Sequence, residues 1–188
     1  MTYAFATYSS PVGELTMAAS QTGLAALLWE DDAPSRVRWD RGEEAPHLAL
    51  FKEVARQLDQ YFDGQRTVFN LPLDFHGTPF QKTVWVALLQ IPFGQTRSYA
   101  QVAERINRPS ACRAVGAANG RNPLSIIAPC HRVIGAGGAL TGFAGGVQVK
   151  QRLLDHERTV TLSMSGEWRT QEDSNLWPLP SEGNALSS

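Results

Sequence analysis

Cysteine is scarce in this chain, and its scarcity excludes several kinds of site. Of 188 residues, only Cys112 and Cys130 are cysteines. Two cysteines cannot build a disulfide framework, and a reducing cytosol would keep both as thiols. They also fall short of the usual four-ligand zinc site, and the four histidines show no ligand spacing with them. We therefore expect no metal, and each thiol needs its own explanation.

Long apolar runs are also missing. No stretch approaches the roughly 18 apolar residues that a membrane span needs, so we expect no membrane contact. The first residues, MTYAF, lack both the basic lead and the continuous apolar stretch of a signal peptide. These features predict a cytoplasmic protein.

The chain has almost no net charge, but its charges are unevenly distributed. The total is −1. Residues 1–77 carry six Lys and Arg against eleven acids, a net charge of −5. Residues 78–165 carry ten against three, a net charge of +7, and residues 166–188 carry one against four, a net charge of −3. A nucleic acid needs a positively charged surface, and only the middle segment offers one.

Residues 1–77 predict a small α/β domain. Short strands are expected at 2–8, 13–19 and 23–29, because turn sequences rich in Pro and Gly separate them. Such strands suggest an antiparallel meander. From 47 to 62, apolar residues recur at helical spacing, and Gly64 follows where a C-terminal cap belongs. The polar residues 74–77 are a plausible linker to a second domain.

Residues 78–165 predict a mostly α-helical domain with a helix-turn-helix. The sequence TPFQ at 78–81 is a helix start, and SYAQ at 98–101 repeats the capping pattern for a second helix. Asn107-Arg108-Pro109 breaks this helix, and a third is expected over 111–118. Two short helices joined by a tight turn are typical of a helix-turn-helix, although many helical hairpins bind nothing.

The expected third helix consists almost entirely of small residues. Arg113 is its only long side chain. Helices that read base edges in the major groove normally present several Arg, Asn, Gln or Lys side chains. A slim helix instead suits the minor groove, with one long side chain inserted into the base stack. Alternatively, the small residues only let two helices pack tightly.

Cys130 is the candidate nucleophile because His131 follows it. A free cysteine is more often a small core residue, but a basic neighbour favours the reactive thiolate. Residues 124–128 read as a buried strand or extended run that leads to Cys130. Adjacent residues of an extended segment face opposite ways, so either the chain bends or a water joins the sulfur to the imidazole. The acid that orients His131 stays open among the three in the basic segment: Glu104, Asp155 and Glu157.

Downstream of Cys130, six glycines fall within residues 135–146 and surround the run LTGFA. Such a loop can bring backbone donors close to a planar ligand. It lacks the Gly-Lys-Ser/Thr ending of a phosphate-binding loop. The alternative is a plain flexible loop.

Together, these residues resemble the O6-alkylguanine-DNA alkyltransferase (methylated-DNA–protein-cysteine methyltransferase) family. The resemblance covers about residues 78–157 and is carried by SY at 98–99, CRAVGAANGRNP at 112–123, PCHRV at 129–133 and LTGFAGG at 140–146. The first 77 residues fit the family only in outline. The resemblance implies a ribonuclease-H-like N-terminal domain and DNA repair without a cofactor. In that repair, one alkyl group moves irreversibly from O6 of guanine to the protein's own cysteine.

The resemblance also implies catalytic roles. Cys130 looks like the alkyl acceptor, with His131 acting through a water and Glu157 holding His131. Asn122 looks like the residue that ties the turn carrying the nucleophile. Tyr99 looks like the phenol that donates a proton toward the departing guanine.

The contacts with DNA follow in the same way. Arg113 looks like the finger that holds the gap left by a flipped nucleotide. The rest of the minor-groove face is expected to comprise Tyr99, Ala111, Cys112, Ala114 and Gly116. The guanine pocket is expected to comprise Val133, Phe143 and Ala144. The expected partner is double-stranded DNA that contains O6-alkylguanine, and activity on O4-alkylthymine is left open. We expect a monomer, and cooperative binding to DNA is left open. When bound to DNA, the protein is expected on the nucleoid.

Three features depart from the family. Ala144 stands where some relatives have Ser, which leaves only its backbone amide for the substrate. Cys112 is interpreted as a packing residue beside the finger. The zinc-binding cysteines of some relatives are absent. Beyond about Thr161 the chain has no counterpart in the family. We expect residues 166–188 to be a disordered tail in which Trp177-Pro178-Leu179-Pro180 could be a docking segment.

Two other functions compete with this interpretation. One is a non-catalytic lesion sensor related to the family, against which Cys130 argues because such sensors replace the nucleophile. The other is a thiol hydrolase that uses Cys130, His131 and Glu157. A hydrolase would turn over, whereas a suicide transferase acts once.

Overall fold

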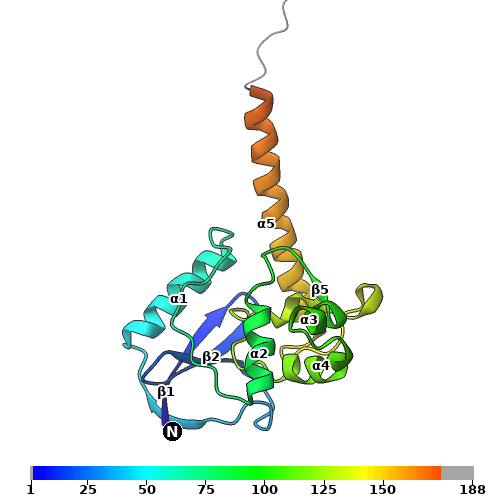
Figure 1. Ribbon diagram of the computed structural model, residues 1–188. Coiled ribbons are helices and arrows are strands. Elements are labelled where there is room, and N and C mark those ends of the chain that lie inside the picture. Colours follow the sequence, from blue (N-terminus) through cyan, green and yellow to red (C-terminus); the bar gives the residue numbers. More distant parts are fainter. Residues whose placement is uncertain (1, 175–188) are drawn as a thin grey trace, which may run out of the picture.

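The computed structural model describes residues 2–174, with side chains as far as residue 166. It contains a four-stranded sheet covered by α1 and, beside it, a group of short helices formed by α2, α3 and α4 (Figure 1). The long helix α5 leads away from both (Figure 1). The predicted fold, an α/β domain followed by a helical domain, is confirmed.

The sheet contains the predicted meander and one strand more. β1 (Thr2–Ser10), β2 (Gly13–Ala19) and β3 (Leu24–Trp29) pair antiparallel in sequence order. β4 (Asp40–Glu44) pairs parallel with β1, so the sheet is mixed rather than purely antiparallel. The sequence of β4, DRGEE, has no apolar alternation because this strand is a largely exposed edge.

Helix α1 (Ala49–Phe62) closes one face of the sheet. Its buried residues Phe51, Val54 and Leu58 join a core formed with the apolar side chains of β2 and β3. Gly64 has a φ of +73°, which glycine adopts at little cost after a helix end. The opposite face of the sheet is covered in part by Val37 and Trp39.

The helical domain begins with two capped helices. α2 (Pro79–Leu88) and α3 (Tyr99–Arg105) each start with a complete capping box, at Thr78 and Ser98, as the sequence predicts. After a 3-10 turn comes α4 (Cys112–Gly120), which packs against α2 and α3. The indole Nε1 of Trp85 donates to the carbonyl of Ala118 at 2.9 Å and fixes α4 on α2.

The expected strand over residues 124–128 is wrong. Only Leu124 forms a bridge, with Leu27 of β3, and Ile126 then adopts a φ of +68°. The backbone N–H groups of Ile127 and Ala128 bond to carbonyls within the same segment. The run is apolar because it is threaded through the core between the two domains, not because it pairs in a sheet.

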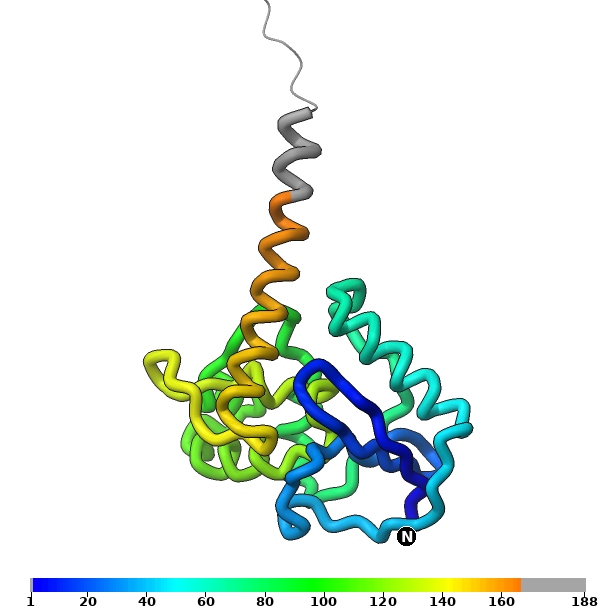
Figure 2. Tube along the Cα trace, turned by 180° about the vertical axis from the view of Figure 1, so that it is seen from behind, coloured from blue at the N-terminus to red at the C-terminus, as the bar shows by residue number. Residues whose placement is uncertain are grey.

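The expectation of a disordered tail from residue 166 is corrected in its first part. α5 (Val147–Ser174) includes residues 166–174, while the remaining residues, with the WPLP segment, lie outside the described part. Residues 161–166 are exposed, and here α5 extends away from both domains (Figure 2). Within residues 2–174, no helix combines the length and apolar character needed to cross a membrane.

Candidate active site

Cys130 lies at a bend of the chain. Cys130–Arg132 form a single 3-10 turn that leads into β6 (Val133–Ile134), so the chain bends where an extended segment would have separated Cys130 from His131. The thiol side chain is only 4% exposed and packs among the apolar residues of the helical domain. The described residues show no direct hydrogen bond between Cys130 and His131.

A short parallel pairing brings Tyr99 to this turn. β5 (Arg97–Ser98) pairs with β6, and Tyr99 follows β5 directly. The phenol oxygen lies 2.9 Å from Oγ1 of Thr141 in the glycine-rich loop. On its other side, a Cβ added at Gly116 of α4 would lie 3.7 Å from the Tyr99 ring. Tyr99 therefore lies between α4 and the loop.

Asn122 ties together the segment before the nucleophile. Its Nδ2 donates to the carbonyls of Ala128 at 2.7 Å and Leu124 at 3.3 Å, and its Oδ1 accepts from the Leu124 N–H at 3.1 Å. One buried side chain thus replaces the pairing that a strand would have supplied. This arrangement holds residues 124–128 in a fixed turn ahead of Cys130.

Of the three candidate acids, Glu157 contacts His131. Nε2 of His131 lies 2.7 Å from Oε1 of Glu157, and both side chains are fully buried. Glu104 and Asp155 are exposed. Because an ionised carboxylate only accepts, Nε2 carries the proton and Nδ1 is the basic nitrogen of neutral His131. Nδ1 is buried and has no hydrogen-bond partner among the described residues.

Glu157 has three further partners that sequence reasoning did not find. Arg132 donates to it through Nε and Nη2, at 2.9 Å each. The Tyr61 hydroxyl of α1 donates to Oε1 at 2.9 Å, and the Gly94 N–H donates to Oε2 at 2.9 Å. Arg132 follows His131 in the PCHRV run, which was a usable signal. Nothing in the sequence around Tyr61 indicated this contact.

These contacts set the charges of both Glu157 and His131. Burial by itself raises the pKa of Glu157, but the hydrogen bonds and charges of His131 and Arg132 outweigh it and hold this pKa at about 2. Burial lowers the pKa of His131, the charges of Arg132 and Lys150 lower it further, and Glu157 opposes them. His131 is therefore neutral at neutral pH and can accept a proton.

Cys130 is not a thiolate in the free protein. Burial raises the pKa of the Cys130 thiol above its ordinary value. A hydrogen bond from Asn122 and the charges of Arg36 and Lys150 oppose this shift without reversing it. The resting thiol keeps its proton, and His131 is placed to remove it during reaction.

Lys150 is a second buried cation that the sequence did not single out. Its Nζ donates to the Val133 carbonyl at 2.6 Å and to the Thr141 carbonyl at 3.4 Å. Burial lowers its pKa. Lys150 thus fastens the glycine-rich loop to the strand that follows the nucleophile.

Comparisons with known proteins place this site in a family. Residues 79–159 match the family described as "6-O-methylguanine DNA methyltransferase, DNA binding domain", and residues 3–75 match its "ribonuclease-like domain". The chain belongs to this family. A methylated-DNA–protein-cysteine methyltransferase of Mycobacterium tuberculosis is 47% identical over 157 residues, covering 82% of this chain and 92% of the relative. The protein of that name from Methanosarcina acetivorans is 44% identical over 158 residues, covering 81% and 97%.

A solved structure supports the same assignment. The crystal structure of Mycobacterium tuberculosis OGT in complex with DNA has a TM-score of 0.73 and 45% identity to this protein. The match covers 85% of this chain and 94% of that chain.

In this member of the 6-O-methylguanine DNA methyltransferase family, the glycine-rich loop packs against the sheet. The Phe143 ring meets the Trp29 ring edge to face, with centroids 5.7 Å apart. A Cβ at Gly145 would lie 2.7 Å from the Trp29 indole, so only glycine fits there. Val133 is buried, while Phe143 and Ala144 are half-buried. The loop is anchored by both domains rather than free.

The α4 helix of this family member presents a small, basic face. Arg113 is exposed and makes no hydrogen bond or ion pair with the other described residues. Ala114 is exposed beside it, and Ala111 and Gly116 are half-buried. Cys112 is also exposed, which corrects its interpretation as a packing residue. It is the first residue of α4.

The residues described contain no group of three or more His, Cys, Asp or Glu side chains that could hold a metal ion.

Proposed function

We propose that this protein repairs DNA by transferring an alkyl group from O6 of guanine to Sγ of Cys130. Membership of the family supports DNA repair by alkyl transfer to a protein cysteine. The observation that carries the assignment to Cys130 is the buried His131–Glu157 pair directly after it, with Nδ1 of His131 as a free base. The second cysteine, Cys112, has no such neighbour.

The thiol loses its proton only as the reaction proceeds. Nδ1 of His131 accepts the proton, through a bridging water for which its buried lone pair is available. Glu157 stabilises the imidazolium that forms. The sulfur then forms a bond to the alkyl carbon while the bond from that carbon to O6 breaks.

Ionising a thiol of ordinary pKa would supply only a small part of the acceleration. An ordinary cysteine is a few per cent thiolate at neutral pH, so complete ionisation gains about 30-fold. A lower pKa would also weaken the nucleophile. A buried thiol with a raised pKa is consistent with catalysis by positioning, in which Nδ1 of His131 is held within reach of the sulfur through one water.

The leaving guanine needs a proton, and Tyr99 is the donor in this scheme. Its hydroxyl is held by Thr141, and the hydroxyl of Thr141 can accept or donate as the phenol changes role. Cys130 loses one proton and guanine gains one, so the protons balance. Solvent returns a proton to Tyr99.

The target oxygen lies inside the base stack, so the nucleotide must be flipped out. Flipping costs a few kcal/mol, less at a weakened base pair. Arg113 projects from the slim face of α4 and can fill the gap that the base leaves. The small residues around it let α4 approach the minor groove closely.

Each molecule should act once, because no group near Cys130 in the described part of the chain is placed to hydrolyse a thioether. A duplex with a radiolabelled O6-methylguanine tests this directly. We expect the label to move to protein up to one methyl per chain and then stop. Label released to solvent with turnover would favour the thiol hydrolase, and binding without transfer would favour the lesion sensor. That the protein is a cytoplasmic monomer stays a prediction.

A further inference from the structure

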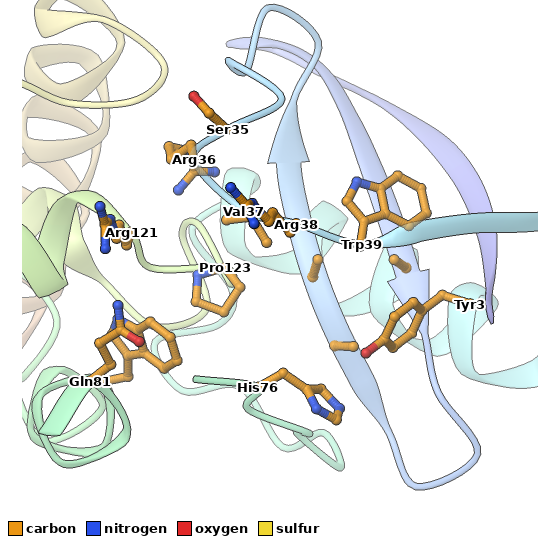
Figure 3. Close-up of a pocket in the computed structure, with 14 residues that line it drawn as sticks. Tyr3, Ser35, Arg36, Val37, Arg38, Trp39, His76, Gln81, Arg121 and Pro123 are labelled. Carbon is orange, nitrogen blue, oxygen red and sulfur yellow. The ribbon is translucent and has the colours of Figure 1, made fainter. Parts of the chain in front are cut away.

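A cavity separate from Cys130 lies between the two domains. Its volume is about 330 Å³. Figure 3 shows Arg36 and Arg38, from the segment before β4, on one side, and Arg121 and Gln81, from the helical domain, on the other. Tyr3 of β1 and His76, from the segment that leads into α2, also line the cavity (Figure 3). Apart from Arg36, whose charge acts on the pKa of Cys130, these side chains have no part in the chemistry at Cys130.

The cavity is cationic, although the domain that forms much of it is acidic. Three arginines and a histidine line it, and no Asp or Glu does. Residues 1–77 have a net charge of −5, yet two of their six basic side chains line this cavity. A guanidinium offers several donors in a fixed plane that matches phosphate oxygens. The chemistry of the cavity therefore suits a phosphate group.

Arg36 already has partners, and these fix the position of the segment before β4 beside the cavity. It forms an ion pair with Asp32, and its Nη1 donates to the carbonyl of Asn122 at 2.6 Å. Arg38 and Arg121 are exposed, and neither makes a hydrogen bond or ion pair with the described residues. The cavity thus offers two unpaired guanidinium groups on a preformed support.

The position of the cavity points to DNA as the source of the phosphate. Arg121 follows the last residue of α4, and Arg113 lies near its start. Eight residues of helix span about 12 Å, while one DNA strand places a phosphate every 3.4 Å of its axis. Both overall views show the segment around residues 31–38 beside the helical domain (Figures 1 and 2). A strand that runs along α4 from Arg113 would next meet this cavity.

We propose that Arg38 and Arg121 bind a backbone phosphate of the DNA strand that passes the C-terminal end of α4. The acidic N-terminal domain then takes part in DNA binding through one local basic site. This inference rests on the DNA binding in the proposed function but not on alkyl transfer. The site reads no bases, so it should act equally on damaged and undamaged duplexes.

The salt dependence of binding to an undamaged duplex tests the proposal. Each phosphate contact contributes about 0.9 to the slope of log Kobs against log salt concentration. We expect Arg38→Gln and Arg121→Gln each to reduce this slope by up to about 0.9 and to weaken binding several-fold at moderate salt. Lys52→Gln removes one charge from the exposed side of α1 and should leave the slope unchanged. Slopes equal to wild type for both arginine variants, with unchanged melting temperatures, would overturn the proposal.

Inorganic phosphate tests whether the cavity binds a free phosphate rather than a phosphate of the DNA backbone. If the cavity serves a free phosphate, wild type should be stabilised by inorganic phosphate at low concentration, Arg38→Gln should lose that effect, and the DNA slope should not move. That result would also overturn the proposal. Because the duplex carries no alkyl group, a failure of alkyl transfer cannot imitate either outcome.

Discussion

The two domains contribute to one site in different ways. The residues assigned to the chemistry all come from the basic domain after residue 78, which also carries the recognisable motifs. The acidic N-terminal domain carries none, yet it supplies the Tyr61 hydroxyl to Glu157 and the Arg36 guanidinium to the Asn122 carbonyl. Chemistry is thus concentrated in one domain, and the rigidity of its reactive groups depends on both.

Glu157 is the point at which this division matters most. It is fully buried, and its charge is balanced by Arg132 while Tyr61 reaches it from the other domain. A buried ion pair contributes little net stability, but removing one partner is costly because the other charge is left uncompensated. The account therefore predicts large effects at Glu157 and graded effects away from it.

Glu157→Gln should have the largest effect on stability. The amide leaves the Arg132 guanidinium buried without a countercharge, at a cost of about 3–5 kcal/mol. Urea denaturation measures the loss. Asp155→Asn makes the same change at an exposed position of α5 and should cost less than about 0.5 kcal/mol. Equal losses of unfolding free energy in the two variants would mean that the buried contacts of Glu157 do not stabilise the packing of the two domains.

Acid should lower the free energy of unfolding of the wild type by protonating the Glu157 carboxylate. Its pKa is about 2 in the folded chain and about 4.3 when unfolded, so its contribution is present above pH 4.3 and is lost as the pH falls toward 2. The difference corresponds to about 3 kcal/mol. Between pH 5 and the onset of acid unfolding, wild type should lose more stability than Glu157→Gln. Parallel pH profiles would show that Glu157 is not the group that titrates.

Tyr61→Phe isolates the contribution of the N-terminal domain. Glu157 keeps its other donors, so the lost hydrogen bond to a buried charge should cost about 2 kcal/mol. Tyr8→Phe is the matched control, because the Tyr8 hydroxyl also donates to a carboxylate, at the exposed Asp59. It should cost about 0.5 kcal/mol. If the two tyrosines behave alike, the contact between the domains adds nothing to the site.

Arg113→Ala should have the smallest effect and should spare stability. We expect repair of duplex DNA to slow about fivefold, or about 1 kcal/mol, since part of the flipping cost is no longer offset. Loss of activity on free O6-methylguanine base should be smaller. Arg152→Ala, an exposed charge on α5, serves as the control. Equal losses on both substrates would refute the finger assignment.

Local sequence signals predicted much of the helical domain. The capping boxes at Thr78 and Ser98 depend on side chains three residues apart, and both formed as expected. The turn carrying Cys130 was anticipated as one of two possibilities. The choice of Glu157 among three acids came from the resemblance, since spacing alone left all three open.

The errors arose where distant parts of the chain meet. β4 is defined by its pairing with β1, and residues 124–128 are shaped by Asn122 and by the cores on either side. The raised pKa of Cys130 follows from its burial, which a neighbouring histidine in the sequence cannot reveal. Tyr61 reaches Glu157 across 96 residues of chain. Such contacts are set by tertiary packing rather than by local pattern.

The most direct test of the account is to locate the transferred alkyl group. The protein is incubated with a duplex containing O6-methylguanine and digested, and its two cysteine peptides are analysed by mass spectrometry. Reactivity set by exposure alone would favour Cys112, whereas the buried relay favours Cys130. The account predicts methylation of Cys130, none of Cys112, and complete loss in Cys130→Ser but not in Cys112→Ser. A methyl group on Cys112, or transfer that survives Cys130→Ser, would contradict it.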